Sequence, residues 1–296
     1  MGRKHGSVGN KMGNEIVKGA LYLVATPIGN LGDLSPRAKH ILESVDFVAA
    51  EDTRVSGKLL SCFSISKPMI SYYEHNKEKR REQLLRRLAA GESCALVTDA
   101  GMPAISDPGA DMVKLCAQAG ILVFAVPGPC AAVAALALSG LDTTRFVFEG
   151  FLPEEKKIRK ARLEEIALEK RTVILYVSPH DLKKVLDEVY AATGNRQIAL
   201  ARELTKRNEE VLRITLEQAI AYYTENDPRG EYVLVMEGIP EGNAQSFWSQ
   251  MEIAAHVKFY VEQGMSRMDA MKAVARDRVV SKNTVYQAIL DEKQIK

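Results

Sequence analysis

The segment Thr98-Asp99-Ala100-Gly101-Met102-Pro103-Ala104-Ile105-Ser106-Asp107-Pro108-Gly109 indicates the fold class of this chain more clearly than any other stretch. It follows the apolar run 94–97, which predicts a buried strand, and precedes the amphipathic stretch 110–120, which predicts a helix. Two Asp, two Gly and two Pro therefore lie at the carboxyl end of a strand, where open α/β sheets bind ligands. Proline removes backbone donors and glycine permits positive φ, so carbonyls and carboxylates favour a cationic or hydroxyl-bearing ligand. A surface turn is the alternative, because Asp-Pro-Gly is also typical of turns.

The composition predicts a globular chain with two hydrophobic cores. The chain has 296 residues, of which 46% are hydrophobic and 26% charged, with a net charge of +2. This balance does not require a nucleic-acid partner, so any basic surface must be local. The four cysteines show no CxxC pattern and no histidine at ligand spacing, which indicates a reducing compartment and no metal site. Since no apolar run reaches about 18 residues, we expect a cytoplasmic protein without membrane contact.

Strands and helices alternate along most of the chain. The tail 1–18 is expected to be flexible. Residues 19–142 predict an N-terminal α/β domain with a largely parallel sheet, and residues 143–240 predict a second α/β domain. Its expected strands are 146–148, 172–177, 232–235 and two near Ile198 and Val211, and its expected helices are 154–169 and 179–190. Residues 245–296 predict a helical region with helix-turn-helix character.

Three further polar motifs follow predicted strands of the first domain. The motif 26–31, TPIGNL, stands where a dinucleotide-binding protein carries GxGxxG, and that fingerprint is absent. The motif Glu51-Asp52-Thr53-Arg54 predicts either an active-site wall or a helix cap with a local ion pair. The motif 127–130, PGPC, completes the set. Loops after parallel strands share one edge, which favours a common ligand site.

Basic residues cluster on several predicted helices. Five of the seven residues 156–162 are basic, and residues 79–87 are also rich in Lys and Arg. Such runs are either solvated faces or RNA contacts. In the helical region the basic residues are Arg267, Lys272, Arg276, Arg278 and Lys282. This pattern is consistent with RNA binding, and a helical packing hairpin is the alternative.

The segment 98–109 closely resembles the signature of one branch of the tetrapyrrole methylase superfamily, the ribosomal RNA small subunit methyltransferase I family. The resemblance covers about residues 20–238. The other motifs that resemble this family are 23–31 (LVATPIGNL), 50–54 (AEDTR), 126–129 (VPGP), 150–153 (GFLP), 176–180 (YVSPH) and 201–206 (ARELTK).

This resemblance implies two α/β domains with S-adenosyl-L-methionine in the cleft between them, and a homodimer. It also implies 2′-O-methylation of the ribose of cytidine 1402, in the decoding centre of 16S rRNA within the small ribosomal subunit. Tetrapyrrole-modifying relatives carry a GxGPG-like first loop, whereas this chain carries TPIGN. Cys130 stands where relatives often carry serine, a nearly isosteric change.

We therefore assign candidate residues to three roles. The candidate catalytic residues are Glu51, Asp52 and Arg54, and a base assisting the ribose hydroxyl is sought first at Glu51 or Asp52. The basic residues of the helical region are assigned to substrate RNA. The candidate cofactor-binding residues, those of the second domain by resemblance, are Pro27, Asp99, Ala100, Gly101, Pro103, Ile105, Ser106, Asp107, Pro108, Pro127, Gly128, Tyr176, Val177 and Ala201.

Two other functions are weighed against this one. A tetrapyrrole C-methyltransferase acting on a precorrin-type substrate would use the same chemistry, but the altered first loop and the helical tail disfavour it. A non-catalytic RNA-binding assembly factor would have lost the cofactor site, and the intact segment 98–109 disfavours that.

Overall fold

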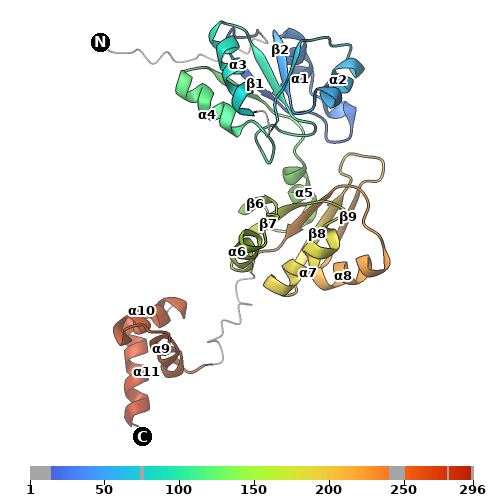
Figure 1. Ribbon diagram of the computed structural model, residues 1–296. Coiled ribbons are helices and arrows are strands. Elements are labelled where there is room, and N and C mark those ends of the chain that lie inside the picture. The colour runs from blue at the N-terminus through green and yellow to red at the C-terminus, as the bar shows by residue number, and fades with distance from the viewer. Residues whose placement is uncertain (1–14, 74–76, 240–250, 279, 295–296) are drawn as a thin grey trace, which may run out of the picture. The chain divides into compact units, whose positions relative to one another are not determined.

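The computed structural model describes residues 15–73, 77–239, 251–278 and 280–294. Most of the tail expected to be flexible, 1–14, lies outside these residues. The chain divides into two compact units, residues 1–238 and 239–296 (Figure 1). The first unit contains two five-stranded sheets, and the second is helical.

The first sheet is entirely parallel, with strand order β3-β2-β4-β1-β5. Its strands are β1 (Leu21–Val24), β2 (Phe47–Ala50), β3 (Met69–Ser71), β4 (Cys94–Val97) and β5 (Val123–Val126). Parallel pairing places all carboxyl ends on one edge, so the loops after β1, β2, β4 and β5 lie there together. The strand predicted at 94–97, the largely parallel sheet and the common edge of the loops are thereby confirmed.

Successive side chains along the strands of this sheet point to opposite faces and contribute to two apolar clusters. Tyr22 and Val24 contribute to one cluster, and Leu21 and Leu23 to the other. The helices of this part are α1 (Pro36–Ser44), α2 (Thr53–Cys62), α3 (Lys77–Ala89) and α4 (Ala110–Ala119), with a short 3₁₀ turn, η1 (Leu31–Asp33). Ser35 caps α1 by accepting a hydrogen bond from the Ala38 amide, as its place before Pro36 predicts.

Helix α5 (Ala131–Ser139) follows the first sheet but packs on the second. Ala132, Ala135 and Leu136 are buried in one cluster with Ile174 and Val233. The small residues of α5 allow this close approach on one face. The helix therefore joins the two sheets (Figure 1).

The second sheet is mixed, with strand order β6-β7-β10-β8-β9. Only the β6–β7 pair is parallel. The strands are β6 (Phe146–Phe151), β7 (Thr172–Val177), β8 (Gln197–Arg202), β9 (Glu210–Thr215) and β10 (Tyr232–Met236). Its further helices are α6 (Lys156–Ala167), α7 (Leu182–Thr193) and α8 (Leu216–Glu225). Helix α8 was not expected from the sequence, although Thr215 and Gln218 form a capping box that marks its start.

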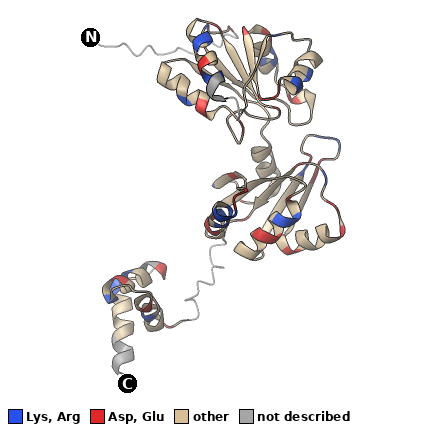
Figure 2. Cartoon of the chain, viewed as in Figure 1, with Lys and Arg blue, Asp and Glu red and all other residues tan. Residues whose placement is uncertain are grey.

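The helical unit consists of α9 (Ile253–Glu262), α10 (Arg267–Asp277) and α11 (Lys282–Gln294). Its core is formed by Val257, Ala270, Val274, Val285 and Ile289. Figure 2 shows that Lys and Arg are interspersed with Asp and Glu on helices of both units. No helix in the described parts of the chain is both long and apolar enough to cross a membrane.

Candidate active site

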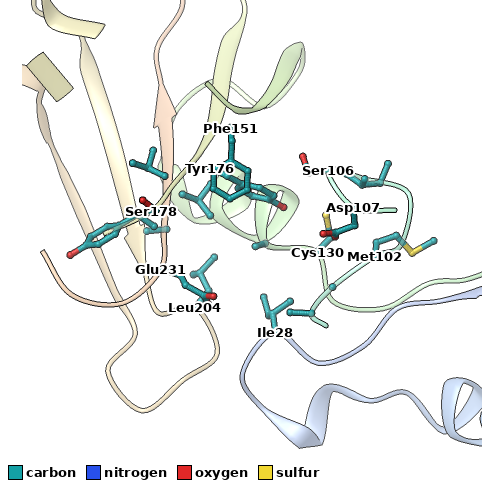
Figure 3. Close-up of a pocket in the computed structure, with 18 of the residues that line it drawn as sticks. Ile28, Met102, Ser106, Asp107, Cys130, Phe151, Tyr176, Ser178, Leu204 and Glu231 are labelled. Atoms are coloured by element: carbon teal, nitrogen blue, oxygen red, sulfur yellow. The ribbon is translucent and has the colours of Figure 1, made fainter. Parts of the chain in front are cut away.

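A cavity of about 370 Å³ lies between the first sheet's loops and the second sheet (Figure 3). Most of its wall is apolar. The polar side chains that reach it include Ser106, Asp107, Ser178 and Glu231. Its full lining is Ile28, Ala100, Gly101, Met102, Ile105, Ser106, Asp107, Cys130, Ala131, Phe151, Tyr176, Val177, Ser178, Pro179, Ala201, Leu204, Glu231, Tyr232 and Val233.

The loop after β4 forms one wall and is held by backbone hydrogen bonds. The Thr26 amide donates to the Gly101 carbonyl at 2.9 Å, and the Gly101 amide donates back to the Thr26 carbonyl at 3.1 Å. Thr26 Oγ1 also donates to the Thr98 carbonyl at 3.1 Å. Ala104 and Ser106 have φ values of 69° and 63°, a conformation that costs a non-glycine residue about 1–3 kcal/mol. The loops after β1 and β4 therefore form one rigid, locally strained wall.

Tyr176 of β7 anchors the opposite wall. Its hydroxyl accepts a hydrogen bond from the Ala132 amide at 3.2 Å, and its ring meets those of Phe148 and Phe151 edge-on. Burial raises the pKa of Tyr176 to about 12, so the hydroxyl keeps its proton at neutral pH. Gly150 of β6 lets the two walls approach closely: its φ of 65° favours glycine, and a Cβ there would lie 2.8 Å from Ser106 Oγ.

Carboxylates gather where the loops after β2 and β4 meet. Burial, followed by the nearby Asp99 charge, raises the pKa of Glu51. Burial is also the largest cause of the raised pKa of Asp99. Burial, and then repulsion from Glu51 and Asp99, raises the pKa of Asp107 to about 7. The protein therefore holds acid groups close together in a partly dry site.

Asp52 behaves differently because it has an internal partner. It caps α2 by accepting from the Arg54 amide at 2.8 Å, and its carboxylate pairs with the Arg54 guanidinium at 2.7 Å. Hydrogen bonds from Arg54 lower the pKa of Asp52 to about 2. The Asp52 amide donates to Asp99 Oδ1 at 3.1 Å, which ties the β2 loop to the β4 loop.

A second cavity, of about 550 Å³, adjoins this cluster. Ser106 and Asp107 line both cavities. The other residues around the second cavity are Glu51, Tyr73, Pro108, Gly109, Ala110 and Asp111.

Comparison with known proteins agrees with this architecture. Residues 20–220 match the family described as tetrapyrrole (corrin/porphyrin) methylases. A cobalt precorrin-4 methyltransferase covers 74% of this chain and 95% of its own with a TM-score of 0.55 and 20% sequence identity. A uroporphyrin-III C-methyltransferase from Thermus thermophilus matches with a TM-score of 0.54 and 20% sequence identity. It covers 74% of this chain and 94% of its own. At this identity the likeness concerns the fold alone.

Sequence relatives are much closer. Proteins named ribosomal RNA small subunit methyltransferase I are 46% identical in Synechocystis sp., over 92% of this chain and 98% of the relative, and 43% in Bacillus subtilis, over 91% and 94%. A relative of the same name in Halalkalibacterium halodurans is 47% identical over 91% of this chain and 94% of the relative. The chain belongs to the ribosomal RNA small subunit methyltransferase I family. It is thus a methyltransferase, and the family expected from segment 98–109 is confirmed.

Eight of the cofactor residues assigned to this methyltransferase from sequence line the first cavity. They are Ala100, Gly101, Ile105, Ser106, Asp107, Tyr176, Val177 and Ala201. The other six lie in the adjoining loops without lining it: Pro27, Asp99, Pro103, Pro108, Pro127 and Gly128. Pro108 instead lines the second cavity.

Other lining residues were not assigned from the sequence. Ile28, Phe151, Ser178 and Leu204 lie inside motifs that carry the resemblance but were not given a role. Glu231 carries no such signal. It reaches the cavity because β10 pairs between β7 and β8, a pairing that local sequence does not specify.

The basic residues assigned to RNA differ in their surroundings. Arg267 and Lys282 are exposed, and Lys272 pairs with Asp269 at 2.8 Å. Arg278 instead donates to His256 Nδ1 at 3.3 Å and to the Met251 carbonyl, within the helical unit. The Arg276 side chain lies outside the described residues. Across the described residues, no group of three or more His, Cys, Asp or Glu is arranged to hold a metal ion.

Proposed function

We propose that this chain transfers a methyl group from S-adenosyl-L-methionine to the 2′-hydroxyl of cytidine 1402 in 16S rRNA, with the small ribosomal subunit as substrate. The observation that carries the proposal is the cavity between segment 98–109 and the second sheet, in a chain whose relatives are named for small-subunit rRNA. The sequence departures from the tetrapyrrole-modifying pattern support RNA over a precorrin-type acceptor.

The cavity fits this cofactor in size and chemistry. Its volume lies in the range typical of small-molecule sites. Its apolar wall suits an adenosine, and the carboxylate of Asp107 suits a cationic sulfonium. We assign the eight lining residues to direct contact and the six loop residues to shaping the wall. When bound, the cofactor supplies a methyl group on a positively charged sulfur.

The chain's own contribution is mainly orientation. The rigid loop pair around Gly101 and the anchored Tyr176 would hold the methyl donor facing the carboxylate cluster. Positioning two reactants in line can contribute about 7–11 kcal/mol of barrier lowering. We assign Glu51, Asp52 and Arg54 to the transfer step or to placing the ribose. Because a group with a pKa of about 2 is a weak base, Asp52 suits placement rather than proton transfer.

We further propose that the helical unit contacts RNA through Arg267, Lys272, Arg276 and Lys282, and that Arg278 supports this surface through its bond to His256. We also propose a homodimer, a cytoplasmic location and the division at residues 142 and 240. Dimerisation is supported by the edge strand β5 and by Leu122 and Val133, whose exposed fractions are 53% and 54%.

The test is methyl transfer to 30S subunits that lack this modification. Single-turnover reactions with labelled S-adenosyl-L-methionine, followed by nuclease digestion and mass spectrometry, should place one methyl on the ribose of cytidine 1402. Methylation of a precorrin-type substrate in place of 30S subunits would support the tetrapyrrole alternative. Calorimetric titration without detectable cofactor binding would instead favour an assembly factor.

A further inference from the structure

Asp107 is placed where two cavities meet. It lines both the cavity assigned to the cofactor and the second cavity beside Glu51 and Tyr73. In Figure 3 its side chain reaches the first cavity beside Cys130. A group that transfers a proton during methylation must contact the acceptor while the donor lies next to it. Asp107 meets this geometric requirement.

The Asp107 carboxylate is also free to accept a proton. Within the described parts of the chain it forms no hydrogen bond or ion pair. The neighbouring carboxylates have partners: Asp52 pairs with Arg54, Asp99 accepts from the Asp52 amide, and Asp111 binds Tyr72 and Arg81. Across the first cavity, Glu231 pairs with Lys206 at 2.7 Å. Glu51 lines only the second cavity.

We infer that Asp107 is the general base of the reaction and that the second cavity receives the acceptor ribose. This inference rests on the proposed function. Asp107 takes the proton of the 2′-hydroxyl as the ribose oxygen bonds to the methyl carbon. The carbon–sulfur bond breaks in the same step and its electron pair stays on sulfur, which leaves a neutral thioether and a protonated Asp107. Proton release to solvent then restores the carboxylate.

The surroundings tune this carboxylate for the task. Burial and the charges of Glu51 and Asp99 bring the pKa of Asp107 to about 7, a value matched to neutral pH. The other titratable groups that line the two cavities with it are Tyr73, Asp111, Cys130, Tyr176, Glu231 and Tyr232. A bound sulfonium would favour the ionised form and move the pKa of Asp107 lower.

The test compares wild type with Asp107→Asn in single-turnover methylation of 30S subunits at saturating cofactor, across pH 5–9. The wild-type rate should rise with pH and level off by about pH 7. The variant should be slower by ~10²–10⁴-fold at the plateau and lose this rise. Calorimetry should show cofactor affinity weakened by no more than about tenfold, or ~1.4 kcal/mol, because the neutral amide no longer attracts the sulfonium charge. A slower rate at saturating cofactor is therefore separate from this loss of binding. Asp46→Asn, outside both cavities, is the matched control and should keep the wild-type profile.

A second readout does not depend on activity. Carboxyl ¹³C NMR of the cofactor-free protein should show one resonance that titrates near pH 7 and is missing in Asp107→Asn. Asp107→Glu should retain more activity than Asp107→Asn, because a carboxylate remains. An Asp107→Asn rate within threefold of wild type would overturn the inference, and so would titration of Asp107 near its ordinary value of 3.8. Inactive wild type would instead overturn the proposed function.

Discussion

At the residue scale, Gly101 both lines the first cavity and has a backbone conformation that favours glycine. Its φ of 85° lies in the left-handed region, and a Cβ there would lie 3.4 Å from Ile28 Cγ2 in the cavity wall. Gly120, which ends α4 with φ 69°, has open space around its Cβ position. Both glycines have a backbone conformation that favours glycine, but only Gly101 lines the cavity. Substituting each of them therefore distinguishes an effect of backbone strain from an effect on ligand binding.

We expect Gly101→Ala and Gly120→Ala each to lower the free energy of unfolding by about 1–2 kcal/mol, because both place an alanine in the left-handed region. Only Gly101→Ala should also weaken S-adenosyl-L-methionine binding, by at least about fivefold, because Gly101 lines the cavity and Gly120 does not. Urea unfolding and calorimetric titration measure the two effects. Equal cofactor affinity in both variants would show that the ligand does not contact this loop.

The raised pKa of Asp107 also predicts an effect on stability. Since folding raises this pKa from 3.8 to about 7, the ionised group destabilises the folded protein as pH rises from about 4 to about 7, and the cost is constant above that. Asp107→Asn should therefore be more stable than wild type at pH 8 by about 1–2 kcal/mol, after allowance for solvent screening. At pH 4 the two proteins should match. Thermal unfolding at both pH values checks this, and a variant less stable at pH 8 would contradict it.

At the element scale, the start of α8 depends on a reciprocal cap. Thr215 Oγ1 accepts from the Gln218 amide at 3.3 Å, and Gln218 Oε1 accepts from the Thr215 amide at 2.9 Å. Thr215→Ala should lower the free energy of unfolding by about 0.5–2 kcal/mol, because the Gln218 amide no longer has its hydroxyl acceptor. Thr215→Ser keeps the hydroxyl and should restore most of the stability in urea unfolding. Cofactor affinity should not change in either variant. An unfolding midpoint that Thr215→Ala leaves unaltered would mean that packing, and not the cap, begins this helix.

At the scale of the whole molecule, the two units are expected to serve different ligands. Residues 1–238 contain both cavities, and residues 239–296 have their own core around Val274 and Val285. A chain truncated after Gly242 should keep wild-type cofactor affinity but bind rRNA more weakly. Its log–log salt slope should also be shallower, by about 0.7–0.9 for each phosphate that the truncated chain no longer neutralises. Filter binding at several salt concentrations measures this, and identical slopes would show that the helical unit does not contact RNA.

Local sequence determined much of this protein. Apolar runs of four to six residues predict most strands, because a buried strand needs little else, and proline after Ser35 marks the start of α1. The parallel orientation of the strands in the first sheet follows from the alternation of strands and helices along the chain. This orientation places segment 98–109 at the edge of the sheet where ligands bind. The resemblance carried by that segment identified the family.

Tertiary structure alone decided the rest. Long-range pairing of β10 between β7 and β8 brings Glu231 to the cavity, and packing of α5 on the second sheet brings Tyr176 to the Ala132 amide. The carboxylates also differ in their partners. Asp52 pairs with its neighbour Arg54, whereas Asp107 lies half-buried near Glu51, which is distant in sequence, and has no partner among the described residues. Burial and charge proximity depend on distances in space, so neighbouring residue types could not reveal which acid group is poised to accept a proton.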